Sequence, residues 1–371
     1  MTAVIRNIDV FKAMEIWAPK HLAYDWDNVG LQLGSFHKPV EKVMVSLDVL
    51  ESTVEEAIDN NVDLIIAHHP LLFKSIKQLN VDTAKGRIIQ KLLQHDISVY
   101  ASHTNLDAAN GGVNDMLCDL LGIQKREIMD NNYTEKLVKI AVFVPHKHAN
   151  DVRDAMSKQG AGHIGDYSHC TFQSPGQGTF KPLDGTNPYM GTQGEVAFVD
   201  EVKIETIIPA AKQMPVLDAI IDAHPYEEVA YDIYPVENSG VTYGIGRVGT
   251  LAEKITLEEL CDRVKTAFAV QNARVTGDLA KEVKQVAVLG GSGEKYISRA
   301  KQMGADVYIT GDMTFHAAQD AQAMGLSVID PGHHVEKVMK EYTKTYLESH
   351  FTGKEIKVIV SKANTDPFQF I

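Results

Sequence analysis

The chain has 371 residues, of which 44% are hydrophobic and 23% are charged; this length and balance exclude a disordered or collagen-like protein and indicate more than one globular domain. Asp and Glu (49) outnumber Lys and Arg (36), which gives a formal net charge of −13, and no basic run is present, so we do not expect nucleic acid to be the main partner. No apolar run approaches the ~20 residues of a membrane span, and the N-terminal sequence lacks a signal-peptide pattern, so we expect a cytoplasmic protein with no membrane partner.

Residues 42–69 predict a strand, a loop, a helix and a second strand: an apolar run is followed by a Glu-rich segment with helical spacing and then by a buried strand over 63–67. Residues 285–312 have the same pattern, at a constant offset of 243 without a gap. The aligned pairs are Val43 with Val286, Val45 with Val288, Ala57 with Ala300, Asp63 with Asp306 and Ile66 with Ile309. The sequence therefore predicts two similar α/β lobes.

Each of these units is followed by another helix and strand, at 89–94 and 97–101 in the first lobe and at 316–324 and 326–329 in the second. Strands that alternate with helices predict right-handed crossovers and a largely parallel sheet. In such sheets, functional groups gather at the carboxyl ends of the strands.

Between the lobes the pattern changes. We predict a strand at 137–144, a helix at 150–159, a Gly/Pro/Thr-rich stretch at 175–194, a strand at 195–207 and a helix at 216–223. This order is typical of a ferredoxin-like α+β module. The predicted fold class is therefore α/β, with two similar lobes (1–135 and 238–371) forming one outer domain around an inserted module (136–237).

Histidines and carboxylates follow three of the predicted strands. His68 and His69 come directly before Pro70, which ends regular strand pairing. Because adjacent strand residues point to opposite faces, both histidines can serve one site only where the strand breaks, or if they bind two different ions. Asp107 follows the next strand, and the matching strand of the second lobe leads into DPGHHVEKV, which contains His333 and Glu336.

We expect these five side chains to converge and to bind metal. Imidazole and carboxylate ligands without cysteine suit Zn²⁺, Mn²⁺ or Fe²⁺, and a carboxylate can bridge two such ions. A centre with two ions lowers the pKa of bound water and polarises the group that is attacked, so hydrolysis is the natural chemistry. The neighbours His103, His334 and Asp312 are interpreted as structural or orienting residues rather than as ligands.

Four weaker motifs have simpler interpretations. GIGRVG at 244–249 indicates a strand with close backbone approach, because it lacks the strand-to-helix context of a dinucleotide site. GGSG at 290–293 is either a tight turn or an anion-binding loop. Thr256 with Glu259 predicts a helix capping box, and the Pro-Tyr-Glu-Glu run at 225–228 is interpreted as a solvated edge.

Taken together, several motifs resemble the NIF-three-like family, also called the GTP cyclohydrolase I type 2 family. The motifs are DNVGLQLG at 27–34, AHHP at 67–70, SHTNLDAANGG at 102–112, GHHVE at 332–336 and NTDPF at 364–368. The middle segment, with HPYEEVAYDIY at 224–234, resembles the PII/CutA-like insert of the longer, YqfO-type bacterial members. The resemblance spans nearly the whole chain.

The resemblance implies a site and an assembly. Carried over position by position, the ligands of two divalent metal ions are His68, His69, Asp107, His333 and Glu336. In many relatives the last histidine and the glutamate are four residues apart, whereas His333 and Glu336 are three apart, so either His333 or His334 is the ligand, and we favour His333. The resemblance also implies a homohexamer whose metal sites face an internal cavity.

Two functions remain open at this point. The first is a dimetal hydrolase that acts on a nucleotide or a related small molecule; the family name implies opening of the guanine ring of GTP. The second is a non-catalytic, regulatory metal-binding assembly in which the inserted module senses a ligand. An open coordination position that holds water favours the enzyme, and a saturated protein shell favours the alternative.

Overall fold

The computed structural model describes residues 4–371 and has a mixed α/β fold with two β-sheets. The chain divides into two compact units, which we call the outer unit (Met1–Tyr133 with Tyr243–Ile371) and the inserted unit (Thr134–Thr242). Among the described residues, no helix is long and apolar enough to cross a membrane. Strands β5 (Gln124–Pro145) and β8 (Tyr231–Thr256) contain the two points at which the chain passes from one unit to the other.

The outer unit contains two lobes. The first lobe comprises α1 (Asn7–Trp17), β1 (Gly30–Leu33), β2 (Lys42–Ser46), α2 (Glu51–Asp59), β3 (Leu64–Ala67), α3 (Ala84–Gln94) and β4 (Ser98–Ala101). The helices α4 (Thr104–Ala108) and α5 (Val113–Leu121) follow it. The second lobe comprises α8 (Leu257–Ala267), β9 (Arg274–Thr276), β10 (Glu282–Ser292), α9 (Ile297–Gln302), β11 (Val307–Gly311), α10 (Phe315–Ala323), β12 (Ser327–Asp330) and the 3₁₀ helix η5 (His333–Val338). The chain then returns through α11 (Met339–His350) to β13 (Lys357–Val360), which joins the sheet of the first lobe.

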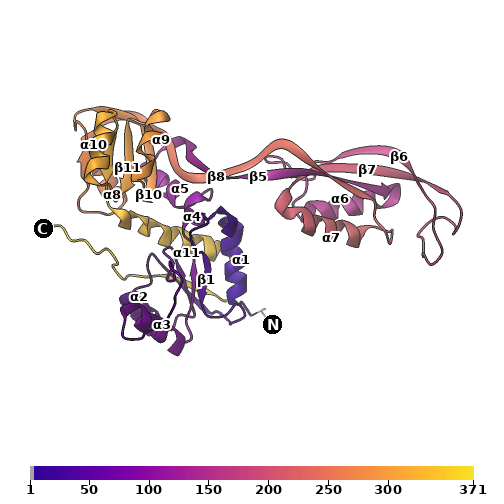
Figure 1. Ribbon diagram of the computed structural model, residues 1–371, viewed down its shortest axis with the longest axis horizontal. Helices are drawn as coiled ribbons and strands as arrows, with labels where there is room; N and C mark the ends of the chain where they lie inside the picture. Colours follow the sequence, from indigo (N-terminus) through magenta and orange to yellow (C-terminus); the bar gives the residue numbers. More distant parts are fainter. Residues whose placement is uncertain (1–3) are drawn as a thin grey trace. The chain divides into compact units, whose positions relative to one another are not determined.

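The sheet of the first lobe has the order β1-β4-β3-β2-β13, in which β4, β3, β2 and β13 are parallel and β1 is antiparallel. Alternate side chains of a strand point to opposite faces. Met44 accordingly packs in a cluster with α2 and α3, whereas Val43 and Val45 pack in the main core, which also contains side chains of α1 and α11. The sheet is thus covered by helices on both faces (Figure 1).

The sheet of the second lobe has the order β8-β10-β11-β12-β9. It repeats three parallel strands, β10, β11 and β12, and an antiparallel edge strand, β9. It differs at the other side, because β8 is antiparallel to β10 whereas β13 is parallel to β2. Val43 pairs with Leu64 in the first lobe and Val286 with Val307 in the second, so the offset of 243 relates the registers as well as the residues.

A pair of hydrogen bonds to an aspartate carboxylate is also repeated at this offset. Asp63 Oδ2 accepts hydrogen bonds from the backbone N–H groups of Glu41 and Lys42, both at 2.9 Å. Asp306 Oδ2 accepts from those of Lys284 and Gln285, again at 2.9 Å. Each carboxylate ties the start of its own strand to the start of the neighbouring strand. This explains why Asp stands at both positions of the sequence repeat.

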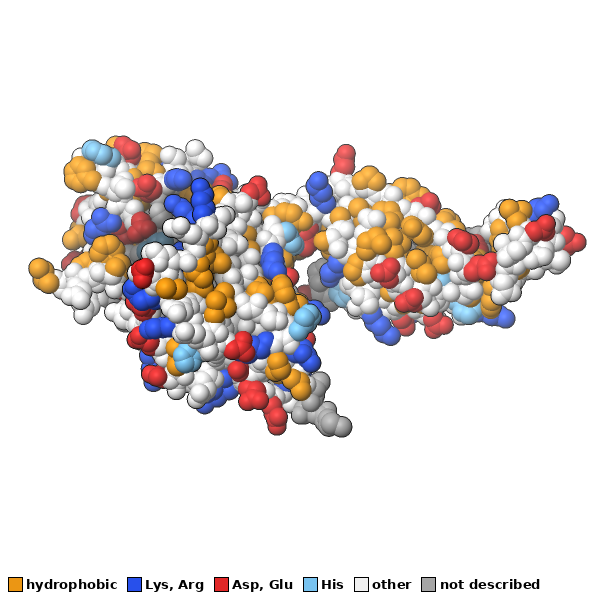
Figure 2. Space-filling model, turned by 60° about the horizontal axis from the view of Figure 1, so that its bottom comes forward, with side chains coloured by type: hydrophobic (Ala, Val, Ile, Leu, Met, Phe, Trp, Pro, Cys, Tyr) orange, Lys and Arg blue, Asp and Glu red, His pale blue; other side chains and the backbone are white. Residues whose placement is uncertain are grey.

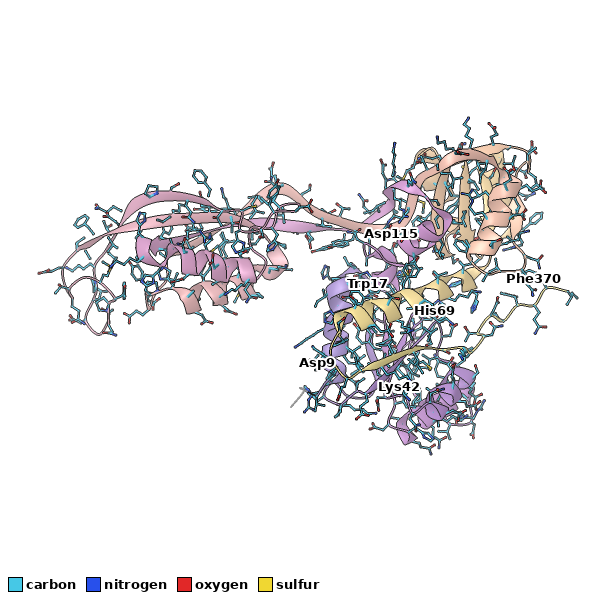
Figure 3. The ribbon with its side chains drawn as sticks, turned by 180° about the vertical axis from the view of Figure 1, so that it is seen from behind. Asp9, Trp17, Lys42, His69, Asp115 and Phe370 are labelled. Atoms are coloured by element: carbon cyan, nitrogen blue, oxygen red, sulfur yellow. The ribbon has the colours of Figure 1, made fainter. Side chains whose placement is uncertain are left out.

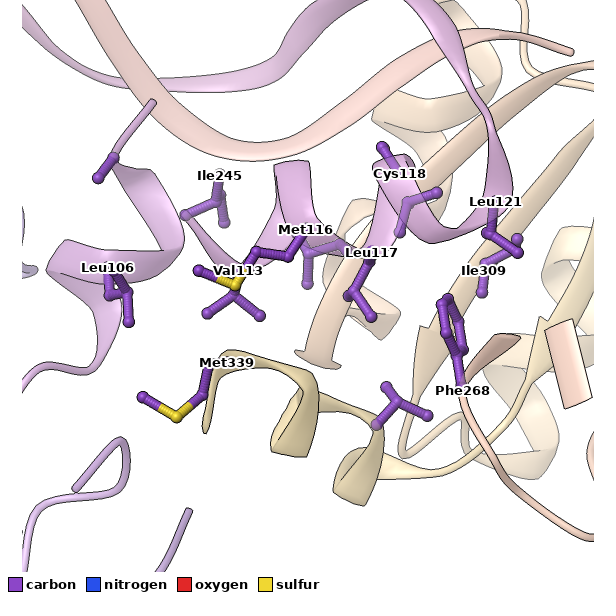
Figure 4. Close-up of a cluster of buried hydrophobic side chains, with 14 of the residues drawn as sticks. Leu106, Val113, Met116, Leu117, Cys118, Leu121, Ile245, Phe268, Ile309 and Met339 are labelled. Carbon is purple, nitrogen blue, oxygen red and sulfur yellow. The ribbon is translucent and has the colours of Figure 1, made fainter. Parts of the chain in front are cut away.

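The main hydrophobic core joins the two lobes through α5 and α11. Met116 and Leu117 of α5, Phe268 beyond α8 and Met339 at the start of α11 are all buried in one cluster (Figure 4). Apolar burial of this kind stabilises by about 25 cal/mol per Å² of buried surface. The two lobes therefore share one hydrophobic core. This shared core fixes the positions of the strand ends of one lobe relative to those of the other.

The inserted unit has its own core. Its elements are the residues from 134 onward of β5, α6 (Ala149–Lys158), β6 (Phe172–Phe180), β7 (Ala197–Pro209), α7 (Gln213–Ala223) and the residues up to 242 of β8. The strands have the order β6-β7-β5-β8, and α6 and α7 pack with them through a separate apolar cluster that includes Val142, Met156, Ile204 and Val216. Figure 2 shows hydrophobic side chains among the charged ones on the surface of this unit.

Some local structure differs from the sequence-based expectation. The Gly/Pro/Thr-rich stretch begins within strand β6, which contains Pro175; β6 is an edge strand, where a residue without an N–H group is tolerated. The segment GIGRVG lies inside β8, as predicted, and the capping box of Thr256 and Glu259 at the start of α8 is confirmed.

Candidate metal centre

The five sequence-predicted residues lie together in the outer unit, at the carboxyl ends of strands from both lobes. His68 and His69 follow β3, Asp107 lies in the short helix α4 after β4, and His333 and Glu336 lie in η5 after β12. Figure 3 shows His69 between the two lobes of this unit. The parallel sheets direct these strand ends toward one another, which explains why residues almost 270 positions apart along the chain meet: His69 and Glu336 are separated by 267.

Glu336 is the centre of the cluster. Its Oε2 lies 3.1 Å from His69 Nε2, 3.1 Å from His333 Nε2 and 3.7 Å from His68 Nε2. Two groups with the spacing of metal ligands share this carboxylate: one contains His69 and His333, and the other contains His68 and Asp107. One carboxylate thus contacts both halves of the cluster.

The helix η5 decides which histidine reaches Glu336. A 3₁₀ helix has about three residues per turn, so side chains at positions i and i+3 lie above one another. This places His333 beside Glu336 and directs His334 elsewhere. Among the described residues, the groups with ligand spacing contain His333 and not His334. The 3₁₀ helix thus brings the imidazole of His333 to Glu336 although only three positions separate them.

His68 and Asp107 present buried polar atoms without partners. His68 is fully buried, its Nδ1–H donates to the carbonyl oxygen of Ser102 at 2.9 Å, and its Nε2 has no hydrogen-bond partner. Burial lowers the pKa of His68, which keeps the imidazole neutral. Asp107 Oδ1 is also buried without a partner, 3.6 Å from His68 Nε2. Unpaired buried polar atoms are costly, and both residues belong to one group with ligand spacing.

Carboxylates orient the other two imidazoles. His69 Nδ1 lies 2.7 Å from Asp48 Oδ1, and His333 Nδ1 lies 2.7 Å from Asp312 Oδ2. Burial lowers the pKa of His69, but Asp48 and Glu336 outweigh it and raise that pKa to about 10. Glu336, together with Asp312, raises the pKa of His333 to about 9. Both rings are therefore held with Nε2 directed at Glu336.

The two buried carboxylates of the cluster have opposite pKa shifts. Burial alone raises the pKa of Glu336, but hydrogen bonds from the surrounding imidazoles hold it well below the usual range. Burial and repulsion from Glu336 raise the pKa of Asp107 well above its usual range. A positive charge between the two carboxylates would relieve this repulsion.

His103 is closer to the cluster than the sequence indicated. Its Nδ1 lies 2.9 Å from Asp27 Oδ1, and it forms a third group with ligand spacing together with His68 and His69. Burial raises the pKa of Asp27, but contacts with His103 and Thr104 lower it to about 2.

Asp27 and Asp48 were not predicted from sequence as orienting residues. The available signals were that Asp27 opens the quoted motif DNVGLQLG and that Asp48 follows the end of β2.

A glycine and an asparagine side chain also fit the cluster. The first is Gly291, in the GGSG stretch: a Cβ atom there would lie 2.7 Å from Glu336 Oε1, and the residue has a φ of +65°. Only glycine adopts this conformation without strain and leaves space for the carboxylate. The second is Asn114, which accepts from the Gly290 N–H at 3.0 Å and donates to the Asp107 carbonyl oxygen at 2.9 Å, so it connects the two lobes at the site.

The cluster opens into a cavity of about 690 Å³, a size typical of small-molecule sites. Two exposed aromatic side chains line it: Trp26 is 58% exposed and Phe73 is 45% exposed, with ring centroids 5.8 Å apart. Lys295, from the second lobe, also lines the cavity. Large apolar rings exposed beside a polar cluster are typical of binding sites.

Comparisons with known proteins cover nearly the whole chain. Residues 5–367 match the family described as Duf34/NIF3 (NGG1p interacting factor 3). A protein of Halalkalibacterium halodurans named "GTP cyclohydrolase 1 type 2 homolog" is 49% identical over 364 residues, 98% of each chain. A Bacillus subtilis protein with the same name is 49% identical over 373 residues, 100% of each chain.

Solved structures give the same result. A Bacillus cereus protein described as related to NIF3 is similar with a TM-score of 0.94 and 48% identity, over 100% of both chains. The Staphylococcus aureus protein SA1388 is similar with a TM-score of 0.78 and 34% identity, over 99% of both chains. The sequence motifs, the fold and these matches agree, and the chain belongs to the Duf34/NIF3 family.

Proposed function

We propose that the centre holds two divalent metal ions and that the protein is a metal-dependent hydrolase of a nucleotide or a related small molecule. The proposed ligands are His68, His69, Asp107, His333 and Glu336. The observation that carries the proposal is the position of Glu336, whose carboxylate is common to two groups with ligand spacing. A carboxylate in this position suits a bridge between two ions.

The donor set supports the presence of metal. The unpaired atoms His68 Nε2 and Asp107 Oδ1 are buried beside each other, and a cation would satisfy both. Asp48 and Asp312 hold the other imidazoles with Nε2 toward the site, as carboxylates do for histidine ligands. Neutral imidazole and carboxylate without thiolate suit Zn²⁺, Mn²⁺ or Fe²⁺.

The residues around the cluster support hydrolysis. Bound ions would lower the pKa of water and polarise the group under attack. His103, whose Nδ1 is held by Asp27, lines the cavity and is placed to hold or move a proton at Nε2. Trp26 and Phe73 offer faces on which a planar ring can stack, and Lys295 offers a positive charge to an anionic group. The name of the relatives, "GTP cyclohydrolase 1 type 2 homolog", is consistent with a nucleotide.

A second candidate is a non-catalytic metal-binding assembly with a regulatory role. It is favoured by the inserted unit, which has its own hydrophobic core and its own ligand-sized cavity. In both candidates we propose that this unit is a ferredoxin-like, PII/CutA-like module, that the chain forms a cytoplasmic homohexamer, and that the partner of the metal site is a small molecule.

Metal analysis combined with a hydrolysis screen of nucleotides and phosphoesters tests the proposal. We expect two ions per chain and turnover that Asp107→Ala and Glu336→Ala each abolish, because each change removes a carboxylate that would hold the ions. The matched control is His334→Ala, which leaves the proposed ligands in place and keeps both metal and turnover. Two bound ions without turnover of any screened compound would favour the regulatory candidate, and absence of bound metal would refute both.

Substrate binding can be observed separately from turnover. The chain has two tryptophans, and Trp17→Phe leaves Trp26 as the single reporter at the cavity. We expect GTP to quench its fluorescence and inorganic phosphate alone to leave it unchanged, because the base stacks on the ring. Equal responses to both would show that the base does not contact Trp26.

A further inference from the structure

The inserted unit contains a second cavity, of about 720 Å³, that is built entirely from its own residues. Strands β5, β6 and β7 form part of the wall, and the segments 181–189 and 226–230 complete it. This volume lies in the range of sites for small molecules. The cavity shares no residue with the metal centre, and the function proposed above does not use it.

A buried carboxylate lines this cavity. Glu201 of β7 is 8% exposed, and the Tyr226 hydroxyl donates to its Oε1 at 2.9 Å. A Cβ atom on Gly178 would lie 2.2 Å from Glu201 Oε2, so the glycine leaves the space that the carboxylate occupies. The position of this charge is therefore built into two neighbouring strands.

Glu201 lacks a cationic partner. Within residues 4–371 it forms no salt bridge, and Lys203, two residues along β7, pairs instead with Glu205 at 2.9 Å. A single hydroxyl donor uses only a small part of the hydrogen-bonding capacity of a carboxylate. A buried carboxylate without further donors is energetically costly. A ligand with N–H donors would supply the missing partners.

Aromatic rings cluster around Tyr226, the donor to this carboxylate. Tyr226 lies 5.7 Å from Phe180 and 6.2 Å from Tyr189, measured between ring centroids. The segment that carries Tyr189 is tied to the wall, because the Asn187 N–H donates to the Glu227 carboxylate at 3.1 Å. The Pro-Tyr-Glu-Glu run is therefore part of this cavity rather than only a solvated edge. Rings of this kind pack against planar ligands.

We propose that this cavity binds a planar nitrogen heterocycle of the aminopurine or aminopyrimidine class, whose N–H groups donate to Glu201 and whose ring packs among Tyr226, Tyr189 and Phe180. The inserted unit would thus be a ligand-binding unit with a site of its own. This inference does not depend on the metal centre or on its activity.

Calorimetric titration of the full-length protein with guanosine and with adenosine tests the proposal, and anisole serves as a ring without a hydrogen-bond donor. We expect one or both nucleosides to bind and anisole not to bind. Glu201→Gln keeps an oxygen acceptor for Tyr226 but replaces the charge, and it should weaken nucleoside binding about tenfold or more. Glu237→Gln, an exposed change in the same unit, should leave binding unaltered, and circular dichroism should show that both variants are folded.

The results separate this cavity from the metal centre. Binding that survives in Asp107→Ala and is weakened in Glu201→Gln supports the proposal. Absence of binding at millimolar nucleoside overturns it. So does binding that is insensitive to Glu201→Gln, and so does binding that is lost in Asp107→Ala alone, because that result would assign the nucleoside to the metal cavity.

Discussion

Metal binding to this protein is expected to release about two protons per chain at pH 7. His69 and His333 have pKa values raised to about 10 and about 9 by the carboxylates that hold them, so both rings carry a proton at neutral pH before an ion binds. An imidazole must be neutral at the nitrogen that binds a metal, and each ring must therefore lose a proton. His68 contributes none, because burial lowers its pKa.

The sign of the pH dependence follows directly. As the pH falls, protons compete with the ions for Nε2 of both rings, so the affinity for metal decreases. Between about pH 6.5 and pH 8.5, where both rings are protonated, the logarithm of the apparent association constant should rise by about two per pH unit. Without the raised pKa values, the competition would end near ~6.5, the pKa of free histidine.

The assay is calorimetric titration of chelator-treated protein with Zn²⁺ in two buffers that differ in their enthalpy of ionisation. The difference between the two heats gives the number of protons released. His333→Ala should lower this number by about one, because it removes one protonated ring, and His334→Ala should not change it. A release of less than one proton at pH 7 in the unaltered protein would refute the reasoning.

Three further predictions concern the framework of the site. Gly291→Ala should lower the metal content and destabilise the protein by about 1–2 kcal/mol, whereas Gly304→Ala, which has a similar positive φ but no atom within 4 Å of the added Cβ, should lose similar stability and keep its metal. Asp63→Ala and Asp306→Ala should each cost about 1–3 kcal/mol in denaturant unfolding, and clearly unequal losses would contradict the structural equivalence of the lobes. Removing residues 134–242 should leave a folded, metal-binding outer unit, and loss of both metal and cooperative unfolding would contradict its independence.

The convergence of the candidate ligands could be predicted from sequence because parallel strands end at a common edge. His68, Asp107 and His333 each follow an apolar run that is long enough for a strand, and the repeat showed that both lobes have the same order of elements. The carboxylates that orient the rings could not be assigned in this way. Asp48 and Asp27 reach their histidines across loops whose course depends on packing rather than on local pattern.

Two local features also depended on tertiary context. The separation of three residues between His333 and Glu336 is ambiguous in sequence, and it is resolved because the segment forms the helix η5, in which positions i and i+3 lie on one face whereas i and i+2 do not. Strand β6 contains Pro175 and two glycines, which locally disfavour a strand. Its pairing with β7 over nine residue pairs outweighs that local preference.

The repeat itself explains how two similar lobes form one asymmetric site. At the offset of 243, His69 of the first lobe corresponds to Asp312 of the second. The first is a candidate ligand, and the second is the carboxylate that orients His333. Likewise, Asp48, which orients His69, corresponds to Gly291, where a side chain would collide with Glu336. Each equivalent position thus has a different role on the two sides of one cavity. The two lobes are therefore complementary at the centre although they are alike in their sheets.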